Sequence, residues 1–193
     1  MSALIISGDS SGTITLDAPA VAGSTTQSLV AVSGTLAPIV TGTSQTAPFA
    51  VNTYADFIGI PSWVKRITVM FSGVGTNGTS GFLVQIGAGS IDTSGYISAS
   101  FQTSSSTQLL STAGFAVFNN NANDATSGPL VLTLFGNNIW QASGVLFKDS
   151  STDYLVISGG SKTLSSTLDR VRITTVNGTD TFDTGSIVNI LYE

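Results

Sequence analysis

The feature that most constrains the fold is a two-residue alternation between apolar and polar side chains, repeated in short segments. In the segment 64–71, V-K-R-I-T-V-M-F, the apolar residues Ile67, Val69 and Phe71 occupy every second position. Successive side chains of a β-strand point to opposite faces, so this period predicts a strand that is buried on one face. No segment has the length and the amphipathic period of a helix.

Comparable segments follow at regular spacing. The further strand candidates are residues 82–86, 96–102, 114–118, 130–135, 139–147, 154–158, 168–175 and 186–192. Asn-Gly, Gly-Asn and Gly-Pro pairs between them suit tight turns and positive φ angles. Roughly eight to ten short strands at this spacing predict an all-β fold, an antiparallel β-sandwich or jelly roll.

The composition changes near residue 49. All ten Phe, both Trp and all four Tyr lie from Phe49 onward, whereas residues 1–48 are small, turn-rich and free of aromatic side chains. Such a stretch cannot build its own core. We therefore predict an extended N-terminal arm over residues 1–48, used for attachment, and a β-sandwich domain over residues 49–193. The alternative is that residues 1–48 supply ordinary edge strands of that domain.

Large aromatic side chains are the candidates for core or interface anchors, because they bury the most apolar area. The residues chosen on this ground are Phe49, Phe57, Trp63, Phe71 and Trp140. Trp63 and Trp140 would also suit stacking on sugar rings, and packing in a core or subunit interface is the favoured interpretation.

The composition argues against most enzymatic chemistry. The chain has no His and no Cys, which removes the usual general base near neutral pH, thiol nucleophiles and the commonest transition-metal ligands. A paired-carboxylate hydrolase would need two Asp such as Asp180 and Asp183, but their N-G-T-D-T-F-D-T-G context is typical of turns. We expect no enzyme activity and no catalytic residue, cofactor or metal.

Charge and hydropathy restrict the partners. The chain has six Lys plus Arg against eleven Asp plus Glu, a net charge of −5, so we expect no nucleic-acid binding. Apolar runs such as 130–135 are far shorter than the ~20 residues of a membrane-spanning helix, so we expect no membrane association. Oxygen ligands at 119–121, at 123–124, or at Asp180 and Asp183 suit calcium, with a solvated loop as the favoured interpretation.

Three stretches resemble a known class of proteins. They are I-I-S-G-D-S-S-G-T-I-T-L-D-A-P-A-V-A-G at 5–23, D-F-I-G-I-P-S-W-V-K-R-I-T-V-M-F-S-G-V at 56–74, and L-D-R-V-R-I-T-T-V-N-G-T-D-T-F-D-T-G-S-I-V-N-I-L-Y-E at 168–193. Together they resemble virion structural proteins of tailed bacteriophages, described as tail-fibre, minor structural or capsid-decorating. The opening element of that class continues into a repetitive Thr-Leu pattern, whereas this chain has Q-S-L-V-A-V at 27–32. No catalytic residues carry over.

The resemblance implies a location on the outer surface of a phage particle. Tail fibres carry a trimeric shaft with heptads or extended repeats, and this sequence has neither. We therefore expect a capsid decoration or cement protein that binds the major capsid protein or other virion proteins through its arm and assembles as a homo-oligomer, with a trimer as the guess. The alternative is a tail-fibre or baseplate tip that binds host-surface glycans through loops around 119–127.

Overall fold

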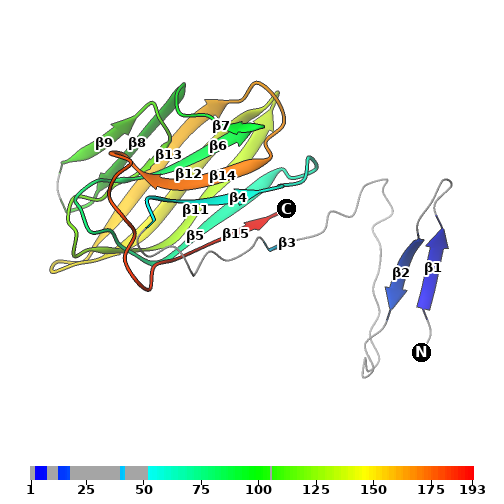
Figure 1. Cartoon of the computed structure of the whole chain (residues 1–193), viewed down its shortest axis with the longest axis horizontal. Coiled ribbons are helices and arrows are strands. Elements are labelled where there is room, and N and C mark those ends of the chain that lie inside the picture. Colours follow the sequence, from blue (N-terminus) through cyan, green and yellow to red (C-terminus); the bar gives the residue numbers. More distant parts are fainter. Residues whose placement is uncertain (1–2, 8–12, 18–39, 42–51, 105) are drawn as a thin grey trace. The chain divides into compact units, whose positions relative to one another are not determined.

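A computed structural model describes most of the chain (Figure 1). It covers residues 3–7, 13–17, 40–41, 52–104 and 106–193, with side chains described for 52–104 and 106–193. The chain divides into two units, Met1–Leu36 and Ala37–Glu193. Phe49, chosen above as an anchor, lies outside the described residues.

The first unit contains a β-hairpin. Strands β1 (Ala3–Ser7) and β2 (Thr13–Asp17) pair antiparallel, with Ala3 opposite Asp17 and Ser7 opposite Thr13. The rest of the predicted arm lies outside the described residues, apart from a two-residue strand at 40–41 that belongs to the second unit.

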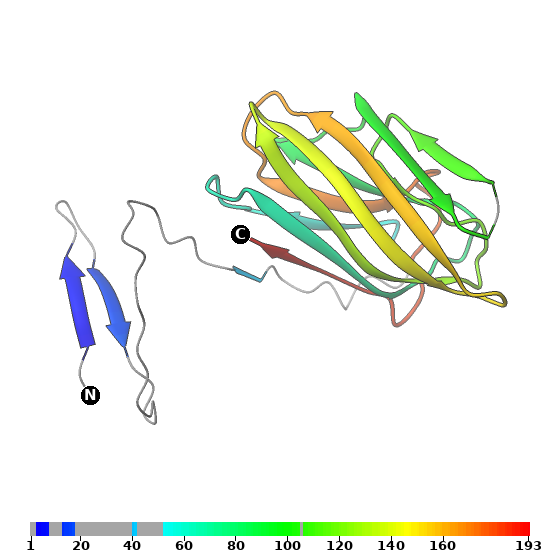
Figure 2. The same cartoon turned by 180° about the vertical axis from the view of Figure 1, so that it is seen from behind.

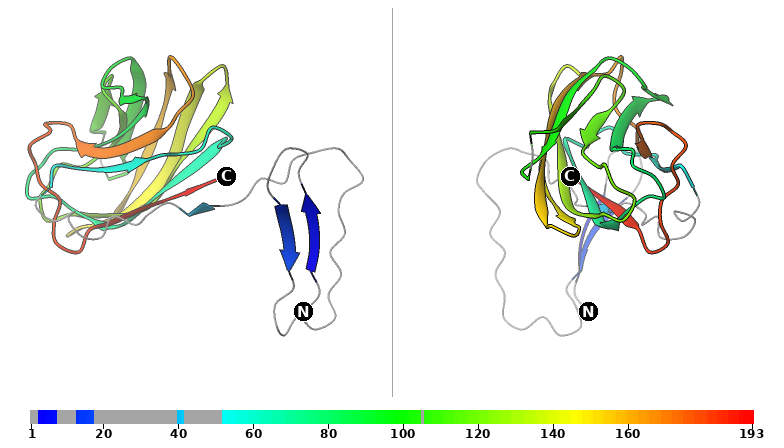
Figure 3. Two further views of the ribbon diagram at one scale, coloured as in Figure 1. Left: turned by 45° about the vertical axis from the view of Figure 1, so that its right-hand side comes forward. Right: turned by 90° about the vertical axis from the view of Figure 1, so that its left-hand side faces the viewer.

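The second unit is an antiparallel β-sandwich, which confirms the predicted fold class. The larger sheet has eight strands, in the order β3 (Val40–Thr41), β15 (Ile187–Tyr192), β5 (Arg66–Val74), β11 (Ala125–Gly136), β12 (Ile139–Asp149), β13 (Tyr154–Thr163), β8 (Tyr96–Gln102) and β9 (Gln108–Ser111). Every pairing in it is antiparallel. The smaller sheet packs against one face of the larger one (Figures 2 and 3).

The smaller sheet has five strands. Its order is β10 (Phe115–Val117), β6 (Phe82–Ala88), β14 (Arg170–Thr175) and β4 (Tyr54–Ile58), and β7 (Ser90–Ile91) pairs with β6 off this path. Within the part of the chain that the structure describes, no helix is long and apolar enough to cross a membrane.

The sandwich core follows from the alternation in the sequence. On β5, Ile67, Val69 and Phe71 are buried and face the smaller sheet, from which Val171 and Ile173 of β14 join the same cluster.

The β11–β12 hairpin turns through two asparagines, at 137 and 138, whose φ angles of 49° and 59° suit a tight two-residue turn. Such turns match the twist of the flanking strands. Next to this turn the register of β11 against β12 shifts between Leu134 and Gly136.

Four of the predicted anchors lie in the described part of the chain. Phe57, Phe71 and Trp140 belong to the buried core cluster, whereas Trp63 is partly buried and packs against it. The Trp63 ring lies 6.1 Å from that of Tyr192, between ring centroids. All four therefore pack within this sandwich, and three of them are covered by it.

Candidate functional site

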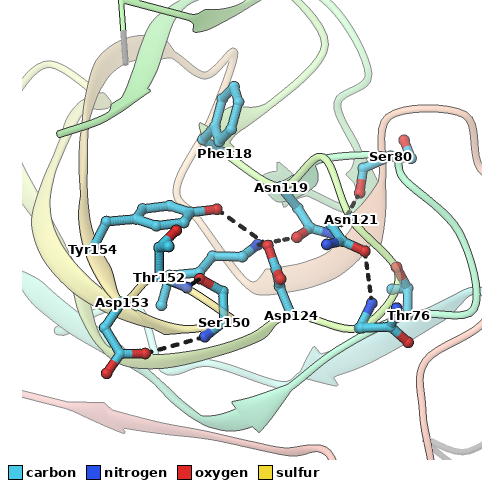
Figure 4. A network of polar contacts seen from close by, with 12 residues as sticks. Thr76, Ser80, Phe118, Asn119, Asn121, Asp124, Ser150, Thr152, Asp153 and Tyr154 are labelled. Carbon is cyan, nitrogen blue, oxygen red and sulfur yellow. Dashed lines mark hydrogen bonds and ion pairs between the residues drawn. The ribbon is translucent and has the colours of Figure 1, made fainter. Parts of the chain in front are cut away.

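A buried polar network joins the two sheets. Lys148 lies on β12 of the larger sheet, and Asn119 follows β10 of the smaller one. Asp124 directly precedes β11, and Tyr154 is the first residue of β13. Figure 4 shows the Asn119, Asp124 and Tyr154 side chains turned toward one another. Segments that are separated in sequence thus bring four polar groups together inside the sandwich.

Strand alternation places Lys148 in the core. On β12 the side chains of Trp140, Ala142 and Leu146 are buried, and Lys148 follows Leu146 by two residues. The lysine side chain is consequently fully buried. Removing an ammonium group from water is costly unless partners replace the water, so the polar groups around Lys148 are needed.

Serines of β8 hold the segment before Asn119. The backbone N–H of Ala116 donates to Ser98 Oγ at 2.8 Å, and that of Phe118 donates to Ser100 Oγ at 2.9 Å. These bonds dock β10, an edge strand of the smaller sheet, onto β8 of the larger sheet. Asn119 is the next residue along, so the serines position its side chain near Lys148.

The Lys148 amine has three neighbours. Its Nζ donates a hydrogen bond to Asn119 Oδ1, lies 3.9 Å from Asp124 Oδ2 and lies 5.7 Å from the centroid of the Phe82 ring. The Asn119 Nδ2 donates to the backbone carbonyl of Ser80 at 3.4 Å. The carboxamide is therefore held from both sides, with its oxygen toward the lysine.

Burial shifts the pKa of two groups in this network. Burial lowers the pKa of Lys148 to about 8, and the negative charge of Asp124 acts in the opposite direction. Burial, together with the charge and hydrogen bond of Asp124, raises the pKa of Tyr154 to about 12. Burial therefore favours the neutral form of the Lys148 amine relative to a solvated lysine. The neutral Tyr154 hydroxyl donates to Asp124 Oδ2 at 3.1 Å.

A polar pocket of about 280 Å³ lies beside Asp124. Its lining residues are Gln102, Ser104, Asn120, Asn121, Asp124, Ser150, Ser151, Thr152 and Tyr154. They offer amides, hydroxyls, one carboxylate and one aromatic ring, and no lining residue is cationic. The volume is near the lower limit of the ~300–1,000 Å³ range of small-molecule sites, so the pocket suits one small polar molecule.

The loops considered above for a cation or for carboxylate chemistry have other contacts. Asp124 faces Lys148 at 3.9 Å, so the charge of its carboxylate is already compensated. The Asp180 carboxylate accepts hydrogen bonds from the Ser80 backbone N–H at 3.1 Å and from Asn177 Nδ2 at 2.6 Å. Burial raises the pKa of Asp183. Among the described residues, no group of three or more His, Cys, Asp or Glu is placed to hold a metal ion.

A second surface stands out on the larger sheet. Its outward side carries seven large apolar side chains on four adjacent strands, each between 36% and 79% exposed. We call this the apolar face; its members are Ile97, Phe101, Leu110, Val145, Phe147, Leu155 and Ile157.

The strand register makes the apolar face continuous. Ile157 of β13 lies directly opposite Phe101 of β8 on one side and Val145 of β12 on the other, and Leu155 lies opposite Phe147. Residues directly opposite on one face of an antiparallel pair are in reach of each other. None of the seven members carries a charge, and the exposed Asp149, two residues after Phe147 on β12, lies at the border of the face.

Asn119 and Asp124 belong to the loop that the sequence indicated for a cation, whereas the sequence pattern did not indicate Lys148. One sequence feature could have predicted a buried Lys148: it stands two residues after Leu146, at the spacing that puts both side chains on one face of a strand. Val145 and Phe147 on the other face are also apolar, so the sequence did not show which face of β12 is buried.

Comparison of the chain with known protein families, with curated proteins and with solved structures gives no match. The functional argument therefore depends on the residues and contacts of this chain.

Proposed function

We propose that this chain is a structural subunit of a tailed-bacteriophage particle, a decoration or cement protein on the outer surface of the capsid. Its N-terminal arm binds the major capsid protein and stabilises the shell, and the sandwich domains of neighbouring copies associate as a homotrimer. The three stretches that resemble virion structural proteins support this proposal, as does the lack of His and Cys in the sequence.

The apolar face is the observation that carries the proposal. Soluble monomers rarely expose a contiguous apolar patch of more than a few hundred Å², and larger patches mark interaction sites. Seven large apolar side chains that are each at least 36% exposed provide several hundred Å², which approaches the ~800 Å² per partner of a standard protein interface. A protein whose most distinctive surface is of this kind works by binding other proteins.

A second copy of this chain is the occupant that the charge distribution favours. The whole chain carries a net charge of −5, so two copies repel each other at a distance. The apolar face has no charged member and only Asp149 at its border, so contact through its centre brings few like charges together. In a homotrimer each copy contacts its neighbour through two different parts of its surface, and the apolar face spans four strands, so it can supply both parts.

The experiment is an occupancy measurement on empty capsids of the phage that encodes the chain. Three forms are compared: the full chain, a form without residues 1–36, and the full chain with Ile97→Asp and Phe101→Asp. The deletion keeps β3, which pairs with β15 in the sandwich. We expect both changes to reduce occupancy at least tenfold while the β-type circular dichroism spectrum is retained. Undiminished occupancy of both forms would overturn the proposal.

The polar pocket favours a second candidate function, a tail tip that binds host glycans. Hydroxyl and amide groups beside the Tyr154 ring match the needs of a sugar, which offers hydroxyls for hydrogen bonds and a face for stacking. A glycan array with the wild-type protein and a Tyr154→Ala variant separates the two functions. Reproducible binding that is lost in the variant supports the tip, whereas no binding together with tight capsid attachment supports decoration.

A further inference from the structure

We propose that Lys148 and Asn119 become joined by an intramolecular isopeptide bond, with Asp124 as the group that carries the proton. The bond would connect the side-chain nitrogen of Lys148 to the side-chain carbonyl carbon of Asn119. It would link β12 of the larger sheet to the segment after β10 of the smaller sheet, so the two layers of the sandwich would be covalently tied. This inference is independent of the proposed function.

The first argument is proximity. The Lys148 Nζ contacts Asn119 Oδ1, which is one bond from the carbon that would be attacked. The carboxamide is held on its other side by the hydrogen bond from Nδ2 to the Ser80 carbonyl. A nucleophile held against its target reacts far faster than the same pair free in solution, because the entropy of bringing them together has already been lost in folding.

The second argument is burial. Lys148 has no exposed surface, and Asn119 and Asp124 are each 4% exposed. The ring of Phe82 lies against the amine. Burial favours the neutral form of the amine, which is the nucleophile. It also keeps water away from the carboxamide, so attack by the lysine competes with little hydrolysis.

The position of the Asp124 carboxylate beside the amine also supports the bond. Asp124 Oδ2 lies 3.9 Å from Nζ and also accepts the hydrogen bond of Tyr154. This separation is longer than a hydrogen bond, and such distances commonly shorten when the reacting complex forms. The carboxylate is therefore placed to take a proton from the Lys148 amine.

The proposed step is balanced without any further reactant. The neutral amine of Lys148 attacks Cγ of Asn119 and forms the new N–C bond. One proton passes from Nζ through the Asp124 carboxylate to Nδ2. The Cγ–Nδ2 bond then breaks with its electron pair on nitrogen, and ammonia leaves. Asp124 ends as it began. The polar pocket beside Asp124, lined by the exposed Asn120 and Asn121, gives the ammonia a way out.

The other buried lysine of the described residues provides a matched control. Lys162 is only 8% exposed and pairs with Asp92 at 2.8 Å, so its amine is also buried beside a carboxylate. Its Nζ donates to the backbone carbonyl of Ser94 at 2.9 Å rather than to a side-chain amide. A backbone carbonyl offers no ammonia as leaving group, so Lys162 should keep a free amine.

Mass spectrometry of the denatured full-length protein tests the bond. Formation lowers the intact mass by about 17 Da, the mass of one ammonia. Trypsin needs a free lysine side chain, so the bond should block cleavage after Lys148 and leave cleavage after Lys162 unchanged. The expected peptide then spans residues 67–162 and lacks one ammonia. An unbonded chain gives separate peptides 67–148 and 149–162.

Three variants assign the reaction to these residues. Lys148→Met and Asn119→Ala each remove a reacting group and should restore the full calculated mass. Asp124→Asn keeps both reacting groups, and its bonded fraction should fall at least tenfold. The wild-type peptide map decides the question even if a variant fails to fold. An unchanged wild-type mass with normal cleavage after Lys148 overturns the proposal. So does a loss of ammonia that maps to the Asn-Gly pairs at 77–78 or 177–178.

Discussion

The hydroxyl of Ser100 on β8 accepts a 2.9 Å hydrogen bond from the backbone N–H of Phe118, one residue before Asn119. The same oxygen lies 2.8 Å from the Ser158 hydroxyl on β13. A small polar residue in the core thus fixes the position of an edge strand and, through it, of the carboxamide that touches Lys148.

Ser100→Ala should destabilise the protein and also disturb the polar network. It leaves the buried Phe118 N–H without its acceptor, which costs about 1–3 kcal/mol. Urea unfolding followed by circular dichroism measures this loss. Ser72→Ala, an exposed position on β5, is the control and should change the unfolding free energy by less than about 0.5 kcal/mol. Equal stabilities for the two variants would contradict the assigned role of Ser100.

The apolar face makes a prediction about assembly. Ile97→Asp with Phe101→Asp should convert the proposed homo-oligomer to a monomer, because aspartates at the centre of an apolar contact would be desolvated without partners. Sedimentation velocity at micromolar concentration measures the change. Ile58→Asp is the control: Ile58 is 72% exposed but lies on β4 of the other sheet. A wild-type chain that sediments as a monomer would contradict the prediction.

The period of the sequence is enough to predict the sandwich but not which face of every strand is buried. On β5 the apolar positions are inside, as expected. On β8 the reverse holds, because Ser98 and Ser100 face inward and accept hydrogen bonds from β10, while Ile97 and Phe101 face outward. The alternation alone assigns those two apolar side chains to the core. Only the docking of β10 decides the orientation.

The sequence alone does not predict the polar network, for a related reason. Asn119 and Asp124 stand in a loop of asparagines that is typical of turns, and Lys148 stands among apolar residues on β12. They meet because β10 and β12 belong to different sheets that pack together. No local pattern encodes that contact between layers.

Two tyrosines predict weakening at high pH. Burial raises the pKa of Tyr96, whose hydroxyl lies within hydrogen-bond distance of the carbonyls of Ile86 and Asp92, and the pKa of Tyr154 rises to about 12. A tyrosine whose pKa is higher in the folded state holds its proton where the unfolded chain has lost it. The free energy of unfolding should therefore fall from about pH 10 upward.

Urea unfolding at pH 9 and at pH 11 measures this fall. Tyr154→Phe should reduce it, because the variant has one fewer buried hydroxyl to ionise. A free energy of unfolding that is constant between the two pH values would contradict the assignment.

The Asn119→Ala variant predicts a pH dependence of the opposite sign. With its partner removed, Lys148 keeps a titratable amine. Burial lowers its pKa to about 8 in the chain with Asn119, and the same burial should hold it below the ordinary 10.5 of the unfolded chain in the variant. Between these values the unfolded chain binds more protons, so the free energy of unfolding should rise with pH from about 8 to 10. In a wild-type chain with the isopeptide bond, the Lys148 nitrogen is an amide that does not titrate, and this rise should be absent. Urea midpoints for both proteins at pH 7, 8, 9 and 10 measure the difference. If the free energy of unfolding of the wild-type protein rises with pH in parallel with that of the variant, Lys148 retains its free amine and the bond is absent.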